Sequence, residues 1–326
     1  MDDIKLINFI KESFLKPLLE QESITDISYN GESLFYQDNV LGRKLSDIQV
    51  NRDQVADFIR QIANLSEKQF SYTVPILDIS IGRYRINAVH QSLCRVGDDK
   101  SISFSIRIAS MESRIRVGDG FLSKKANEIL MDALQNKSSI VIAGPTGCGK
   151  TELQKYLLKN LADYSRVIVI DNVQELDVVR TNKRIDLTSW QVNPNSKEGT
   201  FEELIRNSLR SNPDWLVIAE SRGREMKDVL NAVMTGHPLI STLHSKDINS
   251  IPHRMAKMVE MGETSQDYEE ILDDILDHIE TFVYVNRYIS KTGKVYRYIE
   301  SIAKSQKNTR NLAILYKKEK SKSESI

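Results

Sequence analysis

The chain has 326 residues, a length that favours two domains over one core. It is 40% hydrophobic and 28% charged, with 14 Gly and 7 Pro, which is the composition of a folded soluble protein. Lys plus Arg and Asp plus Glu number 45 each, so the total charge gives no support for a nucleic-acid surface, although a local basic patch is compatible with a neutral total.

Neither a membrane span nor an export signal is predicted. The longest apolar runs, SIVIAG and RVIVID, have the length of strands. The start, MDDIKLINFIKES, is acidic and amphipathic and lacks the basic start and apolar block of an export signal. Cys94 and Cys148 are two cysteines in a long chain, which fits a reducing compartment without a disulfide framework. We therefore expect a cytoplasmic protein.

Residues 1–108 predict an N-terminal α+β domain. A helix is expected from Lys5 to Leu19, and another from about Arg52 to Leu65 because its apolar residues recur at helical spacing. The strands are expected at Ile24 to Tyr29, SLFYQD, ILDISIGRYRINAV and SISFSIRI, the last alternating apolar and polar residues. The charged, Gly-containing residues 109–120 read as a linker.

Residues 121–310 predict a second domain in which strands and helices alternate. The expected order is helix ANEILMDAL, strand SSIVIAG, helix GKTELQKYLLKNLA, strand SRVIVID, helix FEELIRNSLR, strand DWLVIAE, helix REMKDVLNAVMTG and strand LISTLHS. This alternation predicts a mainly parallel sheet covered on both faces. A helix at YEEILDDILDHIE and two strands about a Thr-Gly turn follow, and residues 311–326 are expected to be a charged, disordered tail.

The segment GPTGCGKT, Gly144 to Thr151, fits the phosphate-binding pattern G-x-x-x-x-G-K-[ST] and lies between a strand and a helix. Its glycines let backbone N–H groups close around phosphates at the helix N-terminus. Lys150 is expected to reach the β and γ phosphates, and the Thr151 hydroxyl to bind Mg²⁺. The alternative is a Gly-rich turn without a ligand. The expected nucleotide-binding residues are Gly144, Pro145, Thr146, Gly147, Cys148, Gly149, Lys150, Thr151 and Glu152.

Acidic residues follow two later strands of this domain. Asp171 ends VIVID, with Glu175 four residues on, and Glu220 ends DWLVIAE. Ligands in such sheets gather at the carboxyl ends of strands. Glu220 is the best candidate for activating water, while Asp171 and Glu175 are candidate Mg²⁺ ligands. The alternative for these acids is a helix cap or an ion pair with an arginine.

The segment TGHPLISTLHS holds two of the five histidines. His237 follows Gly236 at the end of a helix, so it is compatible with an ordinary helix-end residue. His244 follows the strand that comes next, at the edge where the γ-phosphate is expected. His244 is therefore the stronger candidate for contacting phosphate.

These segments resemble the hexameric ATPases of type II and type IV secretion, pilus assembly and twitching motility. The resemblance rests on the Walker A loop GPTGCGKT, the acidic box VIVIDNVQEL, the Walker B segment LRSNPDWLVIAESRGRE and the histidine box TGHPLISTLHS, in that order. It covers most of 121–302, and the N-terminal match is weaker. The implied fold is α/β, a P-loop (RecA-like) NTPase domain preceded by the smaller α+β domain.

The resemblance also implies roles for individual residues. Glu220 would be the catalytic glutamate, with Lys150 and His244 as its partners at the γ-phosphate, and Asp171 and Glu175 would belong to the acidic box. Several other residues would contact phosphate or a neighbouring subunit, although each is equally compatible with a solvated side chain: Arg107, Arg206, Arg210, Arg222 and His237.

The chain departs from the family pattern at three points. Asn172 stands where a second adjacent acid is usual, and SNPDWL lacks the acid that relatives carry before Pro-Asp. The Cys-rich zinc module of the longer secretion members is absent from the sequence. The chain is therefore most similar to the shorter type IV secretion and retraction-like members, and Asn172 leaves the strength of hydrolysis open.

The implied function is an ATP-hydrolysing motor that uses Mg²⁺ and works as a homo-oligomeric ring, expected to be a hexamer. Such a ring would move its two domains on inner-membrane components of a secretion, conjugation or pilus machine, attached peripherally to the inner face of the membrane. No direct nucleic-acid binding is expected. Two alternatives remain: a nucleotide-gated assembly protein with little hydrolysis, and a DNA-translocating P-loop motor.

Overall fold

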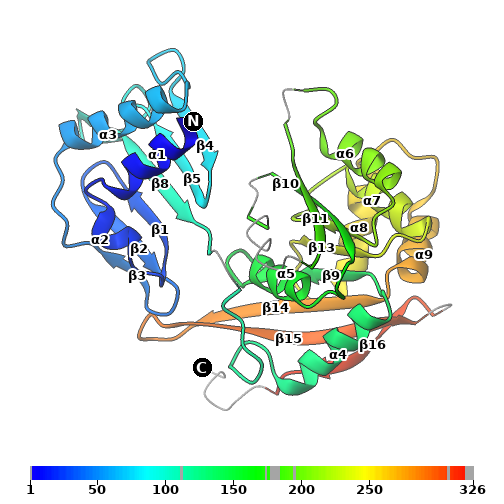
Figure 1. The fold of residues 1–326 in the computed structure, drawn as a ribbon. Helices are drawn as coiled ribbons and strands as arrows, with labels where there is room; N and C mark the ends of the chain where they lie inside the picture. The colour runs from blue at the N-terminus through cyan, green and yellow to red at the C-terminus, as the bar shows by residue number, and fades with distance from the viewer. Residues whose placement is uncertain are drawn as a thin grey trace. The chain divides into compact units, whose positions relative to one another are not determined.

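The structure is a computed structural model that describes residues 2–110, 113–172, 175–176, 184–193, 196–306 and 309–319 (Figure 1). The chain forms two compact units, each with its own sheet, and the predicted α/β class is confirmed. Unit 1 is Met1–Met111 with Ile289–Val295, and unit 2 is Glu112–Tyr288 with Tyr296–Ile326. In the described ranges, every helix is too short or too polar to cross a bilayer.

Unit 1 contains a 6-stranded antiparallel sheet in the order β3-β2-β1-β8-β5-β4. Its strands are β1 (Ile24–Tyr29), β2 (Leu34–Asp38), β3 (Gly42–Leu45), β4 (Ile76–Ile81), β5 (Tyr84–Val89) and β8 (Ser103–Ile108). A separate ribbon joins β6 (Arg95–Val96) to β7 (Asp99–Lys100). The helices are α1 (Asp2–Lys11), α2 (Lys16–Leu19) and α3 (Arg52–Leu65).

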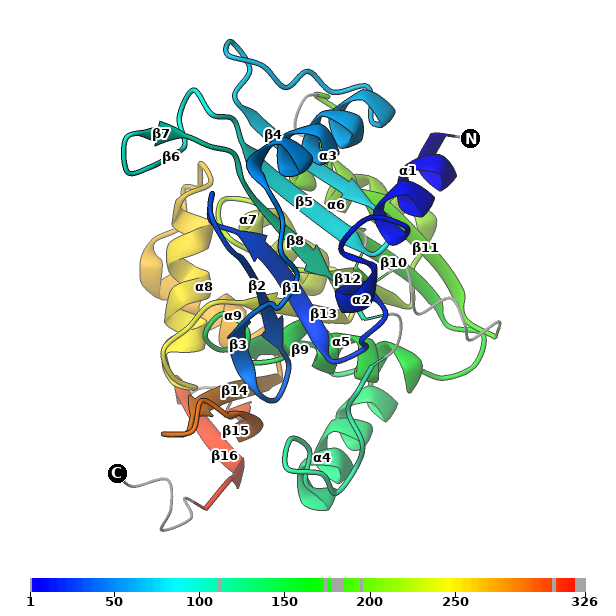
Figure 2. The same cartoon turned by 90° about the vertical axis from the view of Figure 1, so that its left-hand side faces the viewer.

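One face of this sheet is covered and the other is polar. Buried and exposed residues alternate along β4 and β8, as expected for a strand with one face in a core. The buried face packs against α1, α2 and α3 (Figure 2). The polar face carries Arg107, which stands between Asp26 and Arg85 on the neighbouring strands.

The first predicted helix is wrong in its length, because the chain breaks it into α1 and α2. Pro17 cannot continue a helix from the preceding turn, since its ring would clash with the carbonyl four residues earlier. The Ser13 side chain occupies the break: its hydroxyl donates to the Ile10 carbonyl and accepts from the Leu15 N–H. Pro17 lies in the first turn of α2, where a missing N–H costs no intrahelical bond.

Unit 2 contains an 8-stranded sheet in the order β11-β10-β12-β13-β9-β14-β15-β16. Neighbouring strands from β11 to β14 are parallel, whereas β15 and β16 are antiparallel. The strands are β9 (Ile140–Ala143), β10 (Arg166–Asp171), β11 (Asp186–Gln191), β12 (Trp215–Ile218), β13 (Leu239–Leu243), β14 (Thr281–Ile289), β15 (Val295–Gln306) and β16 (Asn311–Lys317).

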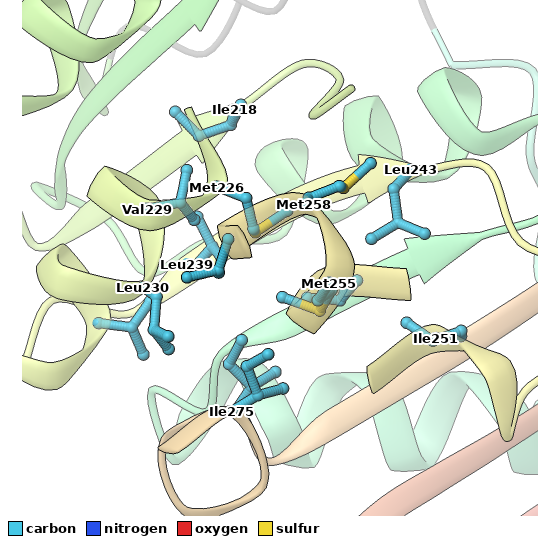
Figure 3. Packing of buried hydrophobic residues seen from close by; sticks show 14 of the residues in the cluster. Ile218, Met226, Val229, Leu230, Leu239, Leu243, Ile251, Met255, Met258 and Ile275 are labelled. Carbon is cyan, nitrogen blue, oxygen red and sulfur yellow. The ribbon is translucent and has the colours of Figure 1, made fainter. Parts of the chain in front are cut away.

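Helices cover both faces of this sheet. They are α4 (Lys124–Gln135), α5 (Lys150–Lys159), α6 (Phe201–Ser208), α7 (Met226–Met234), α8 (Ser250–Glu260) and α9 (Tyr268–His278), with a short 3₁₀ turn at Leu209–Ser211. Strand β9 shows how the layers form, because Ile140 and Ile142 pack toward α4 and α5, while Val141 and Ala143 pack toward α7 to α9. Figure 3 shows the second of these cores, with Met226, Met255 and Ile275 among its members.

Residues 311–317 form β16, so the predicted start of a disordered tail at 311 is wrong. Strand β16 pairs with β15 from Asn311 opposite Gln306 to Lys317 opposite Ser301. Leu312 and Tyr316 pack against the two cores of unit 2, which fixes the strand despite its lysines. Residues 320–326 lie outside the described residues.

Candidate functional site

The segment Gly144 to Gly149, the predicted phosphate-binding loop, connects β9 to α5. Gly149 is the N-cap of α5 with φ at 103°, a left-handed conformation in which a side chain is strained. A Cβ at Gly144 would lie 2.0 Å from the carbonyl oxygen of Val285 on β14. The loop therefore needs glycine at Gly144 for close packing and at Gly149 for its turn.

Replacing Gly144 by Ala is expected to destabilise unit 2. The new Cβ meets a backbone oxygen that the parallel pairing of β14 and β9 holds in place, and such strain and overpacking cost about 1–3 kcal/mol. Chemical denaturation followed by circular dichroism measures the loss. The matched control is Gly120→Ala, because nothing lies within 4 Å of a Cβ there. Equal stability of the two variants would contradict the assigned packing.

Lys150 begins α5 with its side chain folded over the loop. Its Nζ donates to the carbonyl oxygens of Gly144 and Pro145, at 3.0 and 3.2 Å, and lies 3.4 Å from Nδ1 of His244. The residue is only 8% exposed. A buried ammonium at the N-terminus of a helix creates a strongly positive point, which suits a bound polyanion.

His244 links this lysine to Glu220. Its Nε2 lies 2.8 Å from Oε1 of Glu220, and Oε2 of Glu220 accepts from Arg222 at 2.7 Å. Glu220 follows β12, His244 follows β13, and Lys150 follows β9 after the loop, and these three strands are consecutive in the sheet. Because their strands are adjacent, four side chains lie in a row and contact one another in turn. We call them the Lys-His-Glu-Arg row: Lys150, His244, Glu220 and Arg222.

The Glu220 carboxylate is partly buried and kept ionised. Burial alone would raise its pKa, but the hydrogen bond and charge of Arg222, with the charges of His244 and Lys150, lower the pKa below its usual value. Oε1 is buried and lies within ion-pair distance of His244, but the two groups do not form an aligned hydrogen bond. An ionised carboxylate oxygen with acceptor capacity is what activation of a water requires.

The candidate metal ligands are oxygen donors near the same edge. Thr151 is half-buried in the first turn of α5, and Asp171 ends β10, the strand beside β12. Asp171 is 2% exposed, and its Oδ2 accepts from the Leu176 N–H at 3.4 Å. Among the described residues no group of three or more His, Cys, Asp or Glu could hold a metal ion. A hydroxyl with carboxylates fits Mg²⁺, which takes its other ligands from water and phosphate.

Glu152, expected among the nucleotide-binding residues, has its carboxylate engaged elsewhere. Oε2 accepts from the Arg114 N–H at 3.1 Å, and Oε1 lies 3.4 Å from Nζ of Lys155. The Ser113 hydroxyl donates to the Glu152 carbonyl. Glu152 therefore fastens residues 113–114 to α5.

The four candidate arginines lie in different places, and only Arg222 is in the Lys-His-Glu-Arg row. Arg206 on α6 pairs with Asp228 on α7, with Nε 2.9 Å from Oδ1, and also with Glu203. Arg210 is exposed in the 3₁₀ turn after α6, and Arg107 is on the sheet of unit 1. Arg206 thus joins two helices, and its placement gives no support for a phosphate contact.

His237 and His244 lie at opposite ends of β13, so the structure does not bring these two candidate phosphate contacts together. His237 precedes β13 and His244 follows it, so the strand separates them. Nδ1 of His237 lies 3.1 Å from the Thr235 hydroxyl, beside the C-cap of α7. His237 is the helix-end residue that the alternative interpretation described.

The structure adds residues that the sequence analysis missed. Gln154 on α5 is fully buried, and its amide donates to the Ile218 carbonyl at the end of β12. Arg297 donates to the Gly147 carbonyl from β15, 150 positions away in sequence. Gln154 had a signal, because it lies four residues after Lys150 on one helix face. Arg297 had none, because its place depends on the order of the strands.

Comparisons with known proteins identify the family of this chain. Residues 102–281, more than half of the chain, match the family model described as type II/IV secretion system protein. An uncharacterised Bacillus anthracis protein is 28% identical over 275 residues, covering 84% of this chain and 61% of the relative. A putative conjugal transfer protein of Mycobacterium tuberculosis is 25% identical over 258 residues, covering 76% of this chain and 73% of the relative.

A solved structure shares the fold. The Legionella pneumophila ATPase DotB aligns with a TM-score of 0.66 at 18% identity, covering 91% of this chain and 82% of that one. At this identity the likeness shows the fold alone. This chain spans less than two thirds of the Bacillus anthracis relative.

Proposed function

The chain belongs to the type II/IV secretion system protein family, and from that premise we propose that it is an ATP-hydrolysing motor of a secretion, conjugation or pilus system. The observation that carries the proposal is the Lys-His-Glu-Arg row, which sets a buried ammonium, an imidazole and an ionised carboxylate in contact beside a phosphate-binding loop. In this arrangement Lys150 would bind phosphate and Glu220 would activate water.

In the proposed mechanism the loop N–H groups and Lys150 bind the β and γ phosphates. On nucleotide binding the Lys150 ammonium exchanges the carbonyls of Gly144 and Pro145 for phosphate oxygens. Glu220 accepts a proton from the attacking water or orients it, and His244, between Lys150 and Glu220, senses the phosphate. Arg222 keeps the Glu220 carboxylate ionised and oriented.

Mg²⁺ would be held by Thr151, with Asp171 and Glu175 as further ligands, directly or through water, and would neutralise charge that develops on the phosphates.

We propose a RecA-like P-loop fold for unit 2, with the whole chain acting as a homo-oligomeric ring, a hexamer by family resemblance. The ring would act peripherally at the inner face of the membrane on components of the machine. Family membership supports the link to a secretion machine, and the shared fold of the DotB ATPase supports the fold assigned to unit 2.

The test is ATP turnover together with the mass of the protein in solution. We expect a ring-sized species by light scattering and turnover that falls at least about 100-fold when EDTA removes Mg²⁺. Calorimetric titration with ATP checks that the nucleotide binds. A monomer that binds ATP without turning it over would instead favour the nucleotide-gated assembly protein.

A further inference from the structure

Two arginines face the phosphate-binding loop from the hairpin of β14 and β15. Val285 and Ile299 belong to the core on the α5 side of the sheet, and Arg287 and Arg297 are two residues from them, so the pleat puts both arginines on that side. The hairpin register agrees, because Tyr288 stacks on Tyr296 with ring centroids 4.7 Å apart. Arg287 and Arg297 lie one residue further from the turn than these tyrosines, so they share the opposite face of the hairpin.

Both side chains reach Gly147, at the tip of the loop. Nε of Arg297 donates to the Gly147 carbonyl oxygen at 2.7 Å. A Cβ built at Gly147 would lie 3.0 Å from Nη1 of Arg287, so this guanidinium occupies the room left by the missing side chain. The loop tip is thus covered by one guanidinium and hydrogen-bonded to the other.

The positive charge of Arg287 acts on the Cys148 thiol inside the loop. Burial raises the pKa of the Cys148 thiol, while the positive charges of Lys150 and Arg287 act to lower it. Arg287 is exposed, and no carboxylate in the described part of the chain forms an ion pair with it. Lys150 and Arg287 therefore place two cations about one glycine-rich loop, an arrangement that favours a polyanion.

We propose that Arg287 and Arg297 form a second cationic part of the nucleotide site, in which Arg297 positions the loop through Gly147 and Arg287 contacts the nucleotide polyphosphate. The ligand class is a nucleoside di- or triphosphate, and the proposal rests on the proposed function of this site. Guanidinium suits this role because its planar fork donates two parallel hydrogen bonds to phosphate oxygens.

The experiment measures the Kd of ATP, ADP and AMP by calorimetric titration for Arg287→Gln, Arg287→Lys and Arg297→Gln in the full chain. Each loss of a charge-assisted hydrogen bond weakens binding about tenfold. We therefore expect Arg287→Gln to weaken ATP and ADP about tenfold with little change for AMP, and to reduce the salt dependence of the ATP Kd. Arg287→Lys should restore part of the affinity, since a point charge remains.

Arg297→Gln should weaken ATP and ADP by a similar factor while the salt dependence of the ATP Kd changes less than in Arg287→Gln, because Arg297 acts through the loop carbonyl. The matched control is Arg184→Gln, which removes an exposed arginine that pairs with Asp163 elsewhere in unit 2. Thermal unfolding of each variant reports on folding. Arg184→Gln should bind ATP as the wild type does.

Wild-type ATP affinity in both Arg287→Gln and Arg297→Gln, with binding lost in Lys150→Ala, would overturn this inference and leave the proposed function standing. Equal weakening of ATP and AMP in Arg287→Gln would also overturn it, because the contact would then not be to the polyphosphate. Wild-type affinity in Lys150→Ala would instead contradict the nucleotide site itself.

Discussion

Replacing Glu220 by glutamine is expected to lower ATP turnover by about 10²–10⁴-fold while ATP still binds, since that is the range over which a positioned general base acts. Glutamine keeps the shape of the side chain and removes the negative charge. Oε1 of Glu220 lies buried beside Nε2 of His244. Because the amide of glutamine is not a base, the variant loses the group that would take a proton from water. Turnover is measured by phosphate release, and ATP affinity by calorimetric titration.

The structure also says what Glu220→Gln should do to nucleotide affinity. Lys150, the proposed phosphate ligand, contacts His244 and not Glu220. Removing the carboxylate charge beside a polyanion reduces repulsion, so ATP affinity should stay the same or rise. The matched control is Glu263→Gln, an exposed acid in the loop after α8, which should turn over ATP at the wild-type rate. Wild-type turnover in Glu220→Gln would exclude Glu220 as the group that activates water.

Replacing Lys150 by alanine is expected to weaken ATP binding about 100-fold and to bring turnover below detection. The ammonium is the only part of this row that both lies at the loop and carries a fixed positive charge, and hydrogen bonds to charged groups contribute about 1.5–3 kcal/mol each. The control is Lys159→Ala, an exposed lysine in the last turn of the same helix, which should leave both Kd and turnover unchanged.

Lys150→Ala should also change the stability of the protein without ligand. The carbonyls of Gly144 and Pro145 lose a donor, but the gain from removing a buried ammonium opposes that loss. The net effect on the midpoint of thermal unfolding is therefore expected to be small, within a few degrees. ATP should then stabilise the wild type against heat more than the variant at the same ATP concentration, because the variant binds ATP more weakly. Equal stabilisation of both by ATP would contradict the role of Lys150.

The sequence predicted those parts of the fold whose signals are local. The helix Arg52–Leu65 and the strand Ile24–Tyr29 were predicted at their observed bounds, because periodicity and flanking turn residues mark them. The four boxes predicted the family correctly, since each is a strand end with polar residues at fixed places. Lys150, His244 and Glu220 met because parallel strands deliver their carboxyl ends to one edge.

Other elements carried misleading or weak local signals. Helix α8 was missed because Pro252 lies in IPHRMAKMVE, although a proline in the first turn of a helix interrupts no backbone bond. Strand β11 was missed because DLTSWQ is polar for an edge strand, and β10 specifies it by pairing. The contacts of Arg287 and Arg297 with the loop depend on sheet order, which no window of sequence reports.

The turn between β14 and β15 has a consequence for how the protein is made. Ile289–Val295 belongs to unit 1, where the Val295 N–H donates to the Val40 carbonyl at 2.8 Å and Gly293 packs against Gly42. During synthesis the first 111 residues therefore leave the ribosome long before residues Ile289–Val295, which complete unit 1, have been made. A fragment cut in residues 109–120 would lack that segment as well, so unit 1 is not an independent module that could be expressed whole by truncation.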